Sequence, residues 1–482
     1  MVFYGRKKEL GLLQKLYEKL PGMVVIYGRR RIGKTSLIRE FIKDKKSLYF
    51  FVDNNKTIDI LIQDFYNQIN DVLNLPAYIK IKTSEDLLEF LFSYKEDLIV
   101  VFDEFQRFAD IYPAFITQLQ NKWDMMGELS RLYIITSGSS VGMMNRIFLE
   151  GGAPLFKRAD NILTLKPFTP KEIWNYLDKI GITEREEKLK LYLLFGGMIY
   201  YYRLLEKYEC TNFDSALKYL IFDEFGPLRD EIKDILVEEF GRLHPTYYEI
   251  ISALAKGKST QKEIADMTHI APGSLTVYLN NLINLLGIVE YQIPANEKPG
   301  HTKKGRYILK DNFFRFYAYF IYPNMSRFLS GGDYIAFKKM IFSEWQSYSG
   351  HVFEDLARIL LQNYYCREYE ITGGWWNRRG DEIDFIALNK SKVPIAIEVK
   401  NREMIAEDAF QILKKLDHKI DLIPGFFEIN RYKESGEYSN KENKRDVNTG
   451  ILAKGMNSVD RAVIKDRGYL FYDIFDMIEY SV

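Results

Sequence analysis

Continuous apolar runs alternate with helix-like segments in the N-terminal part of the chain. Apolar residues at three- and four-residue spacing predict a helix over 7–20, and the β-branched run after it predicts a strand over 23–28. Further runs at 47–53, 98–104 and 131–140 are typical of strands buried on both faces of a parallel sheet. The pattern predicts an α/β fold with a parallel sheet.

The pattern changes several times further along the chain. Strand-like runs stop near Pro167, a helical stretch follows with a break at Gly196-Gly197, and three short helices then precede two strand-like pieces. Three helices followed by a hairpin are typical of a winged helix-turn-helix. The expected parts are an α/β core (1–170), a helical lid (171–239), a winged helix (240–310), a helical connector (311–345) and a C-terminal α/β domain (346–482).

One stretch of the C-terminal domain has no apolar periodicity. Residues 433–450 are rich in Lys, Asn, Ser and Glu, so we expect a loop there. A turn is expected at 389–392, between two strand-like runs that carry acidic residues.

Composition narrows the class of protein. The chain has 482 residues, 47% of them hydrophobic and 28% charged, which predicts several packed domains. Lys and Arg number 67 against 66 Asp and Glu, so any nucleic-acid surface is a local patch. Two cysteines outside any CxxC exclude a disulfide framework and a cysteine-rich zinc site and indicate a reducing, cytoplasmic setting. Five scattered histidines lack the spacing of metal ligands. Charged residues interrupt every long apolar run, so no membrane partner is expected.

A complete phosphate-binding motif lies directly between a predicted strand and a predicted helix. The sequence from Gly28 to Thr35, GRRRIGKT, matches GxxxxGK[ST] in full. Its glycines let several backbone N–H groups point at one phosphate, and the helix that follows presents its positive end. We expect ATP to contact Gly28, Gly33, Lys34, Thr35 and Ser36, with the Thr35 hydroxyl on Mg²⁺.

Two acidic residues end the apolar run LIVVF. Asp103 is the expected second Mg²⁺ ligand and Glu104 the expected base for water, because sites of α/β sheets form at the C-terminal ends of strands. The run that ends in TSGSS is the expected third strand of the site. Its Ser137 or Ser139 either senses the γ-phosphate or caps the next helix.

At these residues the chain resembles the archaeal-type AAA+ ATPases, a group within the STAND NTPases, over nearly its whole length. The resemblance rests on FYGRKKEL, GRRRIGKTSL, VVFDEFQ, TSGSS, PLFKR and LFGGMIYYY. It implies that Arg6 lies near the nucleotide base and that Arg158 is an arginine finger or sensor. The family usually reads GG-x-P where this chain reads Gly196-Gly197-Met198-Ile199, which leaves the nucleotide-dependent contact of that segment open.

The expected winged helix divides its residues between a small core and an outer face. Helix spacing predicts a core of Ile264, Ala265, Met267, Leu275, Leu279, Leu282 and Leu286. The second helix would enter a DNA major groove with Ser274, Thr276, Asn280 and Asn281 outward. The hairpin tip carries Lys298, Lys303, Lys304 and Arg306, a basic wing suited to phosphates. Because residues 271–286 hold no Arg or Lys, a protein-contacting or packing role is the alternative.

Acidic residues also end two strand-like runs of the C-terminal domain. Asp384 ends EID, Glu398 and Lys400 share one face of the next strand, and Glu354 lies on the helix before both. This set resembles the PD-(D/E)XK nuclease fold, which the C-terminal domain of the same ATPase family also resembles. It implies a divalent-metal site at Glu354, Asp384 and Glu398, with Lys400 as catalytic lysine and Gln411 as a further helix residue.

Charged residues often end strands without forming a site, so a nuclease-like domain without activity is the alternative. Trp375 and Trp376, beside Arg378 and Arg379, either stack on bases or pack in the interior.

Two functions fit these features. The first is an ATP-binding and ATP-hydrolysing switch that controls a DNA-directed module, with a metal-dependent DNA nuclease as the sharpest form of that module. The second is an NTP-dependent sensor or scaffold that binds a protein partner or a further copy of itself, with an inactive nuclease-like domain. Cleavage of DNA in the presence of a divalent cation separates the two.

Overall fold

The computed structural model describes residues 3–76, 78–330, 334–389, 392–423 and 447–480. The chain divides into two units. The first combines Met1–Phe168 with Met198–Tyr201 and Val277–Ile288, and the second holds the remaining segments.

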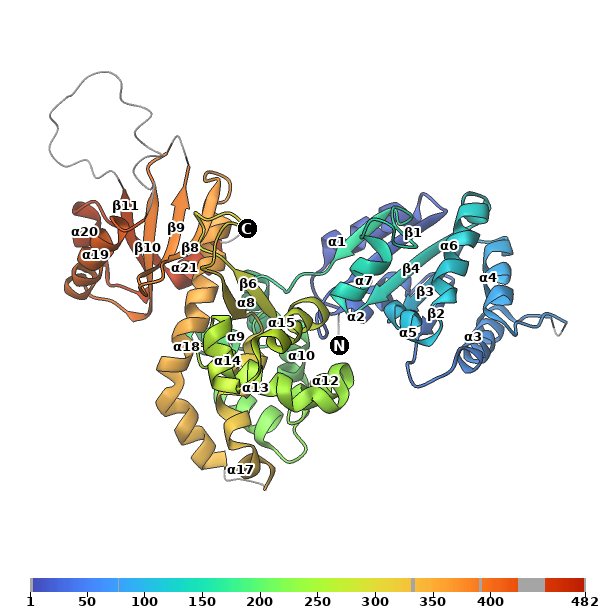
Figure 1. Cartoon of the computed structure of the whole chain (residues 1–482), viewed down its shortest axis with the longest axis horizontal. Helices are drawn as coiled ribbons and strands as arrows, with labels where there is room; N and C mark the ends of the chain where they lie inside the picture. The colour runs from blue at the N-terminus through green and yellow to red at the C-terminus, as the bar shows by residue number, and fades with distance from the viewer. Residues whose placement is uncertain (1–2, 77, 331–333, 390–391, 424–446, 481–482) are drawn as a thin grey trace, which may run out of the picture. The chain divides into compact units, whose positions relative to one another are not determined.

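A parallel sheet forms the centre of the first unit (Figure 1). Its strand order is β2-β3-β4-β1-β5, and every pair is parallel. The strands are β1 Gly22–Tyr27, β2 Ser47–Phe51, β3 Leu98–Asp103, β4 Leu132–Gly138 and β5 Asn161–Thr164. All residues of β1, β3 and β4 are buried, as expected for strands covered on both faces. The predicted parallel α/β sheet is confirmed, with β5 as a strand that the apolar pattern did not predict.

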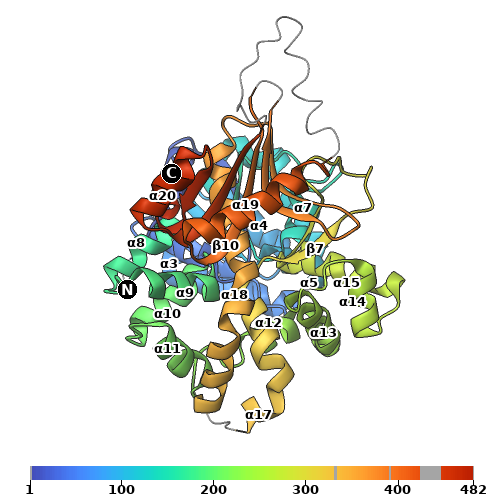
Figure 2. The same cartoon turned by 90° about the vertical axis from the view of Figure 1, so that its left-hand side faces the viewer.

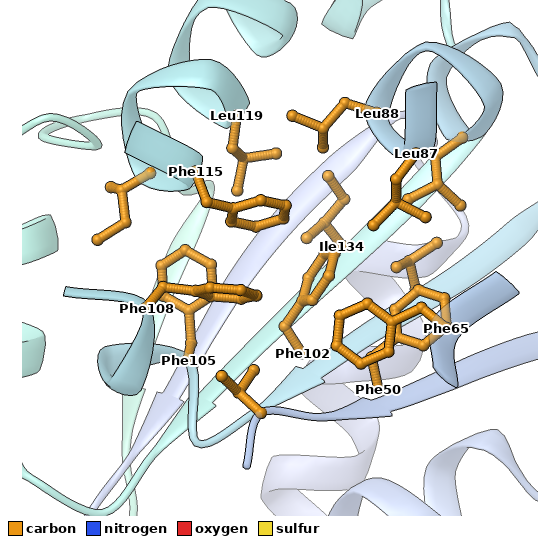
Figure 3. Close-up of a cluster of buried hydrophobic side chains, with 14 of the residues drawn as sticks. Phe50, Phe65, Leu87, Leu88, Phe102, Phe105, Phe108, Phe115, Leu119 and Ile134 are labelled. Carbon is orange, nitrogen blue, oxygen red and sulfur yellow. The ribbon is translucent and has the colours of Figure 1, made fainter. Parts of the chain in front are cut away.

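Helices connect these strands and bury an aromatic core. They are α1 Lys7–Tyr17, α2 Lys34–Ile42, α3 Ile58–Leu73, α4 Ser84–Ser93, α5 Phe108–Ile111, α6 Ala114–Met126 and α7 Val141–Phe148. Figure 3 shows the side chain of Phe102, from β3, among the rings of Phe50, Phe105 and Phe115. Its ring centroid lies 5.5 Å from that of Phe50 and 5.6 Å from that of Phe115. This packing fixes the end of β3, whose last residue is Asp103.

The stretch after the sheet is helical, as predicted. It contains α8 Pro170–Lys179, α9 Arg185–Phe195, α10 Ile199–Lys207, α11 Phe213–Ala216 and α12 Glu231–Phe240. Thr169 and Glu172 form a capping box that begins α8, with Pro170 at its first position. Gly196 adopts a positive φ of 59° between α9 and α10, a conformation that glycine adopts without strain.

Three helices and a hairpin follow in the predicted order. They are α13 His244–Ala255, α14 Gln261–Thr268, α15 Pro272–Asn281, and the antiparallel strands β6 Val289–Gln292 and β7 Arg306–Leu309. The four predicted core leucines are buried. The prediction for Met267 is wrong, because α14 packs through Ile264 and leaves Met267 37% exposed.

The C-terminal part is built on a second, mixed sheet. Short helices α16 Asn312–Phe316 and α17 Met325–Leu329 precede the long helix α18 Tyr334–Tyr365. The sheet order is β12-β11-β10-β9-β8, antiparallel from β8 to β10 and parallel from β10 to β12. The remaining elements are β8 Ile371–Trp376, β9 Glu382–Leu388, β10 Ile395–Glu403, α19 Ala406–Ile420, β11 Asn448–Gly455, α20 Ser458–Asp466, β12 Leu470–Asp473 and α21 Ile474–Tyr480. Both α18 and α19 pack on this sheet (Figure 2).

The structure of this part differs from two predictions. The predicted boundary at 345/346 falls inside α18, because buried positions such as Ile341, Tyr348 and Val352 keep one helical face across it. Of the expected loop at 433–450, residues 433–446 lie outside the described residues, and Asn448 already begins β11. The expected turn at 389–392 falls partly on residues 390–391, which also lie outside them.

Candidate nucleotide and carboxylate sites

The phosphate loop runs from the end of β1 to the beginning of α2. Gly28 and Gly33 have φ values of 157° and 100°, and a Cβ on Gly28 would lie 2.7 Å from the Leu165 carbonyl oxygen. Both glycines are therefore needed for the loop to curl as it does. Thr35 and Ser36 occupy the first turn of α2, where N–H groups without a helical partner favour an anion.

Lys34 is almost fully buried at the beginning of α2. Its ammonium donates to the carbonyl oxygens of Gly28 (2.8 Å) and Arg29 (3.1 Å). These bonds hold the cation across the loop, where a phosphate would meet it.

Asp103 and Thr35 meet as the motif spacing predicts. Asp103 Oδ2 accepts hydrogen bonds from the Thr35 hydroxyl (3.2 Å) and from the Tyr49 phenol. Burial, together with the charge of Asp103, raises the pKa of Tyr49, so the phenol keeps its proton and acts as a donor. The sequence analysis did not predict a role for Tyr49. The only feature that could have indicated one is its phenol hydroxyl within the otherwise apolar part of the strand-like run SLYFFVD.

Glu104 is held by two side chains beside Asp103. Its Oε2 accepts hydrogen bonds from Gln106 Nε2 (2.6 Å) and from the Ser139 hydroxyl (2.7 Å). Its backbone lies in the left-handed region at φ 57°, which turns the chain sharply after β3. Of the two candidate serines, Ser139 joins this group, whereas the fully buried Ser137 hydroxyl makes no hydrogen bond with a described residue.

Arg6 lies beside the phosphate loop, and its place near the nucleotide base stays a prediction. Its guanidinium donates to the carbonyl oxygens of Ile32 (3.4 Å) and Lys166 (2.6 Å) and lies 4.2 Å from the centre of the Phe168 ring. The segment before α1 is thereby tied to the loop.

Arg158 is engaged elsewhere in the same unit. It forms a bidentate pair with Asp124, with both N–O distances at 2.7 Å, and also donates to the Pro154 carbonyl oxygen. None of these partners belongs to the phosphate loop, so a finger role remains a prediction.

The GGMI segment contacts the phosphate loop without a proline. The Arg31 guanidinium lies 4.1 Å from the centre of the Tyr200 ring, and Ile199 lies 3.6 Å from the position of a Cβ on Gly33. The beginning of α10 therefore packs directly on the loop that would hold the phosphates.

The expected DNA-reading helix is partly covered. Residues Val277–Ile288 group with the first unit, where a Cβ on Gly142 of α7 would lie 2.8 Å from the Asn284 carbonyl oxygen. Ser274, Thr276 and Asn280 are exposed as predicted, and Asn281 is half-buried. Three of the four predicted outward positions are therefore exposed, and the covering begins at the last residue of the helix.

The predicted basic wing is docked on the C-terminal sheet. Trp376 Nε1 donates to the Lys304 carbonyl oxygen (2.6 Å), and Ala295 N donates to Gly374 O (2.9 Å). Arg306 pairs with Glu382 at 3.1 Å and lies 4.8 Å from the centre of the Trp376 ring. The Lys304 ammonium pairs with Glu297. Two of the four cations predicted for the wing, Lys304 and Arg306, are therefore engaged within the chain, and their contact with phosphates stays a prediction.

The tryptophan pair serves packing. Trp375 is 1% exposed and Trp376 8% exposed. Neither ring is open to a base in this conformation, so the packing alternative holds.

Asp384 and Glu398 converge on one lysine. The Lys400 ammonium lies 3.9 Å from Asp384 Oδ2 and 3.1 Å from Glu398 Oε2. The distance between Asp384 Oδ2 and Glu398 Oε2 therefore cannot exceed the sum of these two distances. Val399 N donates to Asp384 Oδ2 at 2.7 Å, which fixes β9 against β10 at this point.

The charges of this cluster shift its pKa values in opposite directions. Burial first, and then the charges of Glu398 and Glu354, raise the pKa of Asp384 well above its usual value. Burial would also raise the pKa of Glu398, but Lys400 and Lys419 outweigh it and lower that pKa. The arrangement keeps Glu398 ionised between two cations and favours a proton on Asp384.

Lys419 is a member that sequence reasoning missed. Its ammonium donates to Glu398 Oε1 at 2.6 Å from α19. The residue predicted for this role, Gln411, lies two turns earlier on the same helix and is exposed. The sequence around a lysine on a charged helix does not show whether its ammonium pairs with a buried carboxylate or is solvated.

Glu354 stands at the edge of the cluster. It contributes to the electrostatic environment of Asp384 and Lys400, and its Oε2 lies 3.5 Å from His351 Nδ1. Among the residues that the structure describes, no three His, Cys, Asp or Glu side chains stand close enough to hold a metal together. Two of the three predicted ligands therefore converge, and the third does not complete the set.

Comparisons with known proteins identify the N-terminal part. A family model for an ATPase domain found predominantly in archaea matches residues 3–205, and a model for archaeal and bacterial proteins of unknown function matches residues 317–412. An uncharacterized protein of Methanocaldococcus jannaschii is 32% identical over 438 residues, which cover 88% of this chain and 92% of that protein.

Two proteins of Pyrococcus abyssi are also similar. An uncharacterized ATP-binding protein is 31% identical over 241 residues, which cover 41% of this chain and 70% of that protein. The solved structure of a Walker-type ATPase has a TM-score of 0.51 at 20% identity, covering 66% of this chain and 96% of its own. With the geometry above, residues 3–205 contain an ATPase-type domain with a nucleotide-binding loop. No described helix is long and apolar enough to cross a membrane.

Proposed function

The chain belongs to the family that carries the ATPase domain found predominantly in archaea, and on this premise we propose that it is an ATP-driven switch. It binds ATP with Mg²⁺, hydrolyses ATP, and so controls a DNA-directed module in its second unit. The observation that carries the proposal is that Asp103, at the end of β3, accepts hydrogen bonds from the hydroxyl of Thr35, which follows Lys34, and from the Glu104 backbone N–H.

Nucleotide binding follows from the loop. Backbone N–H groups of Gly28–Gly33 and of the first turn of α2 surround the phosphates, and Lys34 exchanges two carbonyl partners for phosphate oxygens. The Thr35 hydroxyl and the Asp103 carboxylate are oxygen donors of the kind that Mg²⁺ takes. These two residues would hold the ion, which would neutralise charge on the β- and γ-phosphates.

Hydrolysis needs a base for the attacking water, and Glu104 is the residue proposed for it. Hydrogen bonds from Gln106 and Ser139 orient its carboxylate beside Asp103. The contact of Ile199 and Tyr200 with the phosphate loop supports a route by which nucleotide state reaches α10. We propose Arg6 as a positioning residue of the loop and Arg158 as the finger, which would have to leave Asp124 to act.

The second unit supports the DNA-directed part of the proposal. The segment α13 to β7 has the element order of a winged helix, and α18 with the mixed sheet has that of a PD-(D/E)XK nuclease-like domain. Asp384 and Glu398 offer oxygen ligands for a divalent cation, which would polarise a phosphodiester. Lys400, in contact with both carboxylates, would lower the pKa of an attacking water.

A scaffold without nuclease activity is the second candidate. It is favoured by the pairing of Glu398 with both Lys400 and Lys419, which satisfies that carboxylate inside the chain. On this alternative the second unit binds a protein partner or another copy of the chain, under control of the same nucleotide site.

One pair of assays distinguishes the two functions. Plasmid and linear DNA are incubated with the full chain and Mg²⁺ or Mn²⁺, with and without ATP, while ATP hydrolysis is followed in parallel. The nuclease proposal predicts cleavage that Asp384→Ala abolishes and Glu403→Gln, an exposed change on the neighbouring strand β10, preserves. ATP hydrolysis persists in both variants. Hydrolysis without cleavage of any DNA, under all these conditions, selects the scaffold.

A further inference from the structure

A cleft of about 440 Å³ lies inside the second unit, between the α13–β7 segment and the C-terminal sheet. The turn after α13 contributes Lys256 and Lys258 to it, and β7 contributes Arg306. Glu354 and Asp384 line the same cleft. The turn after α13 and the carboxylates of Glu354 and Asp384 therefore line one cleft in this structure.

The cations of this cleft differ in how they are compensated. Arg315 and Arg358 both pair with Asp355, and Arg306 pairs with Glu382. Lys256 and Lys258 are exposed and form no ion pair with a described residue. Glu263 lines the same cleft and interacts electrostatically with Lys258 without an ion pair. Exposed ammonium groups that form no ion pair attract a polyanion.

We propose that this cleft binds one strand of DNA, with Lys256 and Lys258 on phosphates next to the phosphate that faces Glu354 and Asp384. The inference rests on the proposed DNA-directed function and adds the path of the strand. It makes the α13–β7 segment one wall of the site for the strand, instead of a separate reader of duplex DNA.

The size of the cleft favours a single strand. Its volume is in the range of pockets that enclose one small molecule, which suits one nucleotide and not a duplex. A second cavity of about 300 Å³ shares Gln292, Asp355, Arg358, Gly374 and Trp376 with the first and therefore adjoins it. Tyr291, 49% exposed, lines this second cavity. Basic groups beside an exposed aromatic ring are the combination that single-strand binding uses.

The test measures binding separately from cleavage. The full chain carrying Asp384→Ala is titrated into a fluorescein-labelled oligothymidylate, and anisotropy gives the affinity over a series of salt concentrations. Adding Lys256→Ala and Lys258→Ala should weaken binding and make the slope of log K against log salt shallower by about 1.4, two single-strand phosphate contacts. The matched control, Lys233→Ala with Lys262→Ala, removes two exposed lysines of the second unit outside the cleft and should leave the slope unchanged.

Three results would overturn the inference. These are no binding of the oligonucleotide, an equal loss of slope in the control, or a lysine effect confined to a labelled duplex. If the wild-type chain cleaves no DNA but the single-strand slope falls as stated, the strand path stands and the nuclease proposal fails. The two failures are therefore distinguishable.

Discussion

Replacing Tyr49 with phenylalanine removes one hydroxyl from the centre of the nucleotide site. The phenol donates to Asp103, whose side chain is almost fully buried. A hydrogen bond to a charged group contributes about 1.5–3 kcal/mol to stability, against about 0.5–1.5 kcal/mol for a neutral one. We expect Tyr49→Phe to lower the free energy of unfolding of the first unit by about 1.5–3 kcal/mol.

A tyrosine of the same unit whose hydrogen-bond acceptor is uncharged provides the control. The Tyr66 phenol donates to the Ile79 carbonyl oxygen at 3.2 Å, so Tyr66→Phe should cost about 0.5–1.5 kcal/mol. Hydrogen exchange of the β2 and β3 amides, without nucleotide, gives both values as local free energies of opening. The aromatic rings themselves are retained in both variants, so packing changes little.

A double-mutant cycle assigns the effect to the carboxylate. In an Asp103→Asn background the charge is gone, and Tyr49→Phe should cost about 1 kcal/mol less than in the parent chain. Additive costs, or a Tyr49→Phe cost no larger than that of Tyr66→Phe, would refute the reasoning that the phenol supports a charged Asp103.

Three further changes test other parts of the account. Lys34→Ala should weaken binding of a fluorescent ATP analogue at least tenfold, about 1.4 kcal/mol, whereas Lys43→Ala, exposed at the end of α2, should not; equal affinities would remove Lys34 from the site. Phe102→Ala should cost about 3–5 kcal/mol, measured by exchange of the β3 amides, because it empties the aromatic core; a cost below about 1 kcal/mol would contradict that packing. Trp376→Phe removes the N–H bonded to the Lys304 carbonyl oxygen, so amides of β7 should exchange faster while those of β11 do not; unchanged β7 exchange would mean that the hairpin is not held there.

The sequence predicted the phosphate loop and its place between a strand and a helix because the determinants of that loop are local. A glycine loop between an apolar strand and a helix leaves few other structures for Gly28–Thr35, and an apolar run ending in Asp103-Glu104 places both acids at one sheet edge. Tyr49 and Ser139 could not be assigned in the same way. Their roles depend on the strand order β2-β3-β4, which brings their side chains to the acids from neighbouring strands.

The second unit shows where local patterns mislead. Charge spacing predicted Lys304 and Arg306 as part of a basic wing suited to phosphates. Glu297 of the same hairpin pairs with Lys304, and Glu382 and Trp376 of the C-terminal sheet engage Arg306 and the Lys304 carbonyl oxygen. Aromatic composition suggested a connector that ends at 345, whereas the apolar face of α18 continues through that point.

The sequence predicted only the part of the carboxylate cluster that lies on the paired strands. Residues on paired strands, Asp384 with Glu398 and Lys400, follow from strand period and a turn. Lys419 reaches Glu398 from a helix that begins after β10 has ended, a contact that only the packing of α19 on the sheet determines.

ATP turnover by Glu104→Gln decides whether Glu104 is the base for hydrolysis. Nucleotide binding and hydrolysis are measured on the full chain with Mg²⁺, beside wild type and beside Glu128→Gln, an exposed change in the same unit. The account predicts that Glu104→Gln binds ATP as tightly as wild type and loses hydrolysis about 10²–10⁴-fold, the usual contribution of a general base, while Glu128→Gln keeps both. Hydrolysis by Glu104→Gln at the wild-type rate would contradict it.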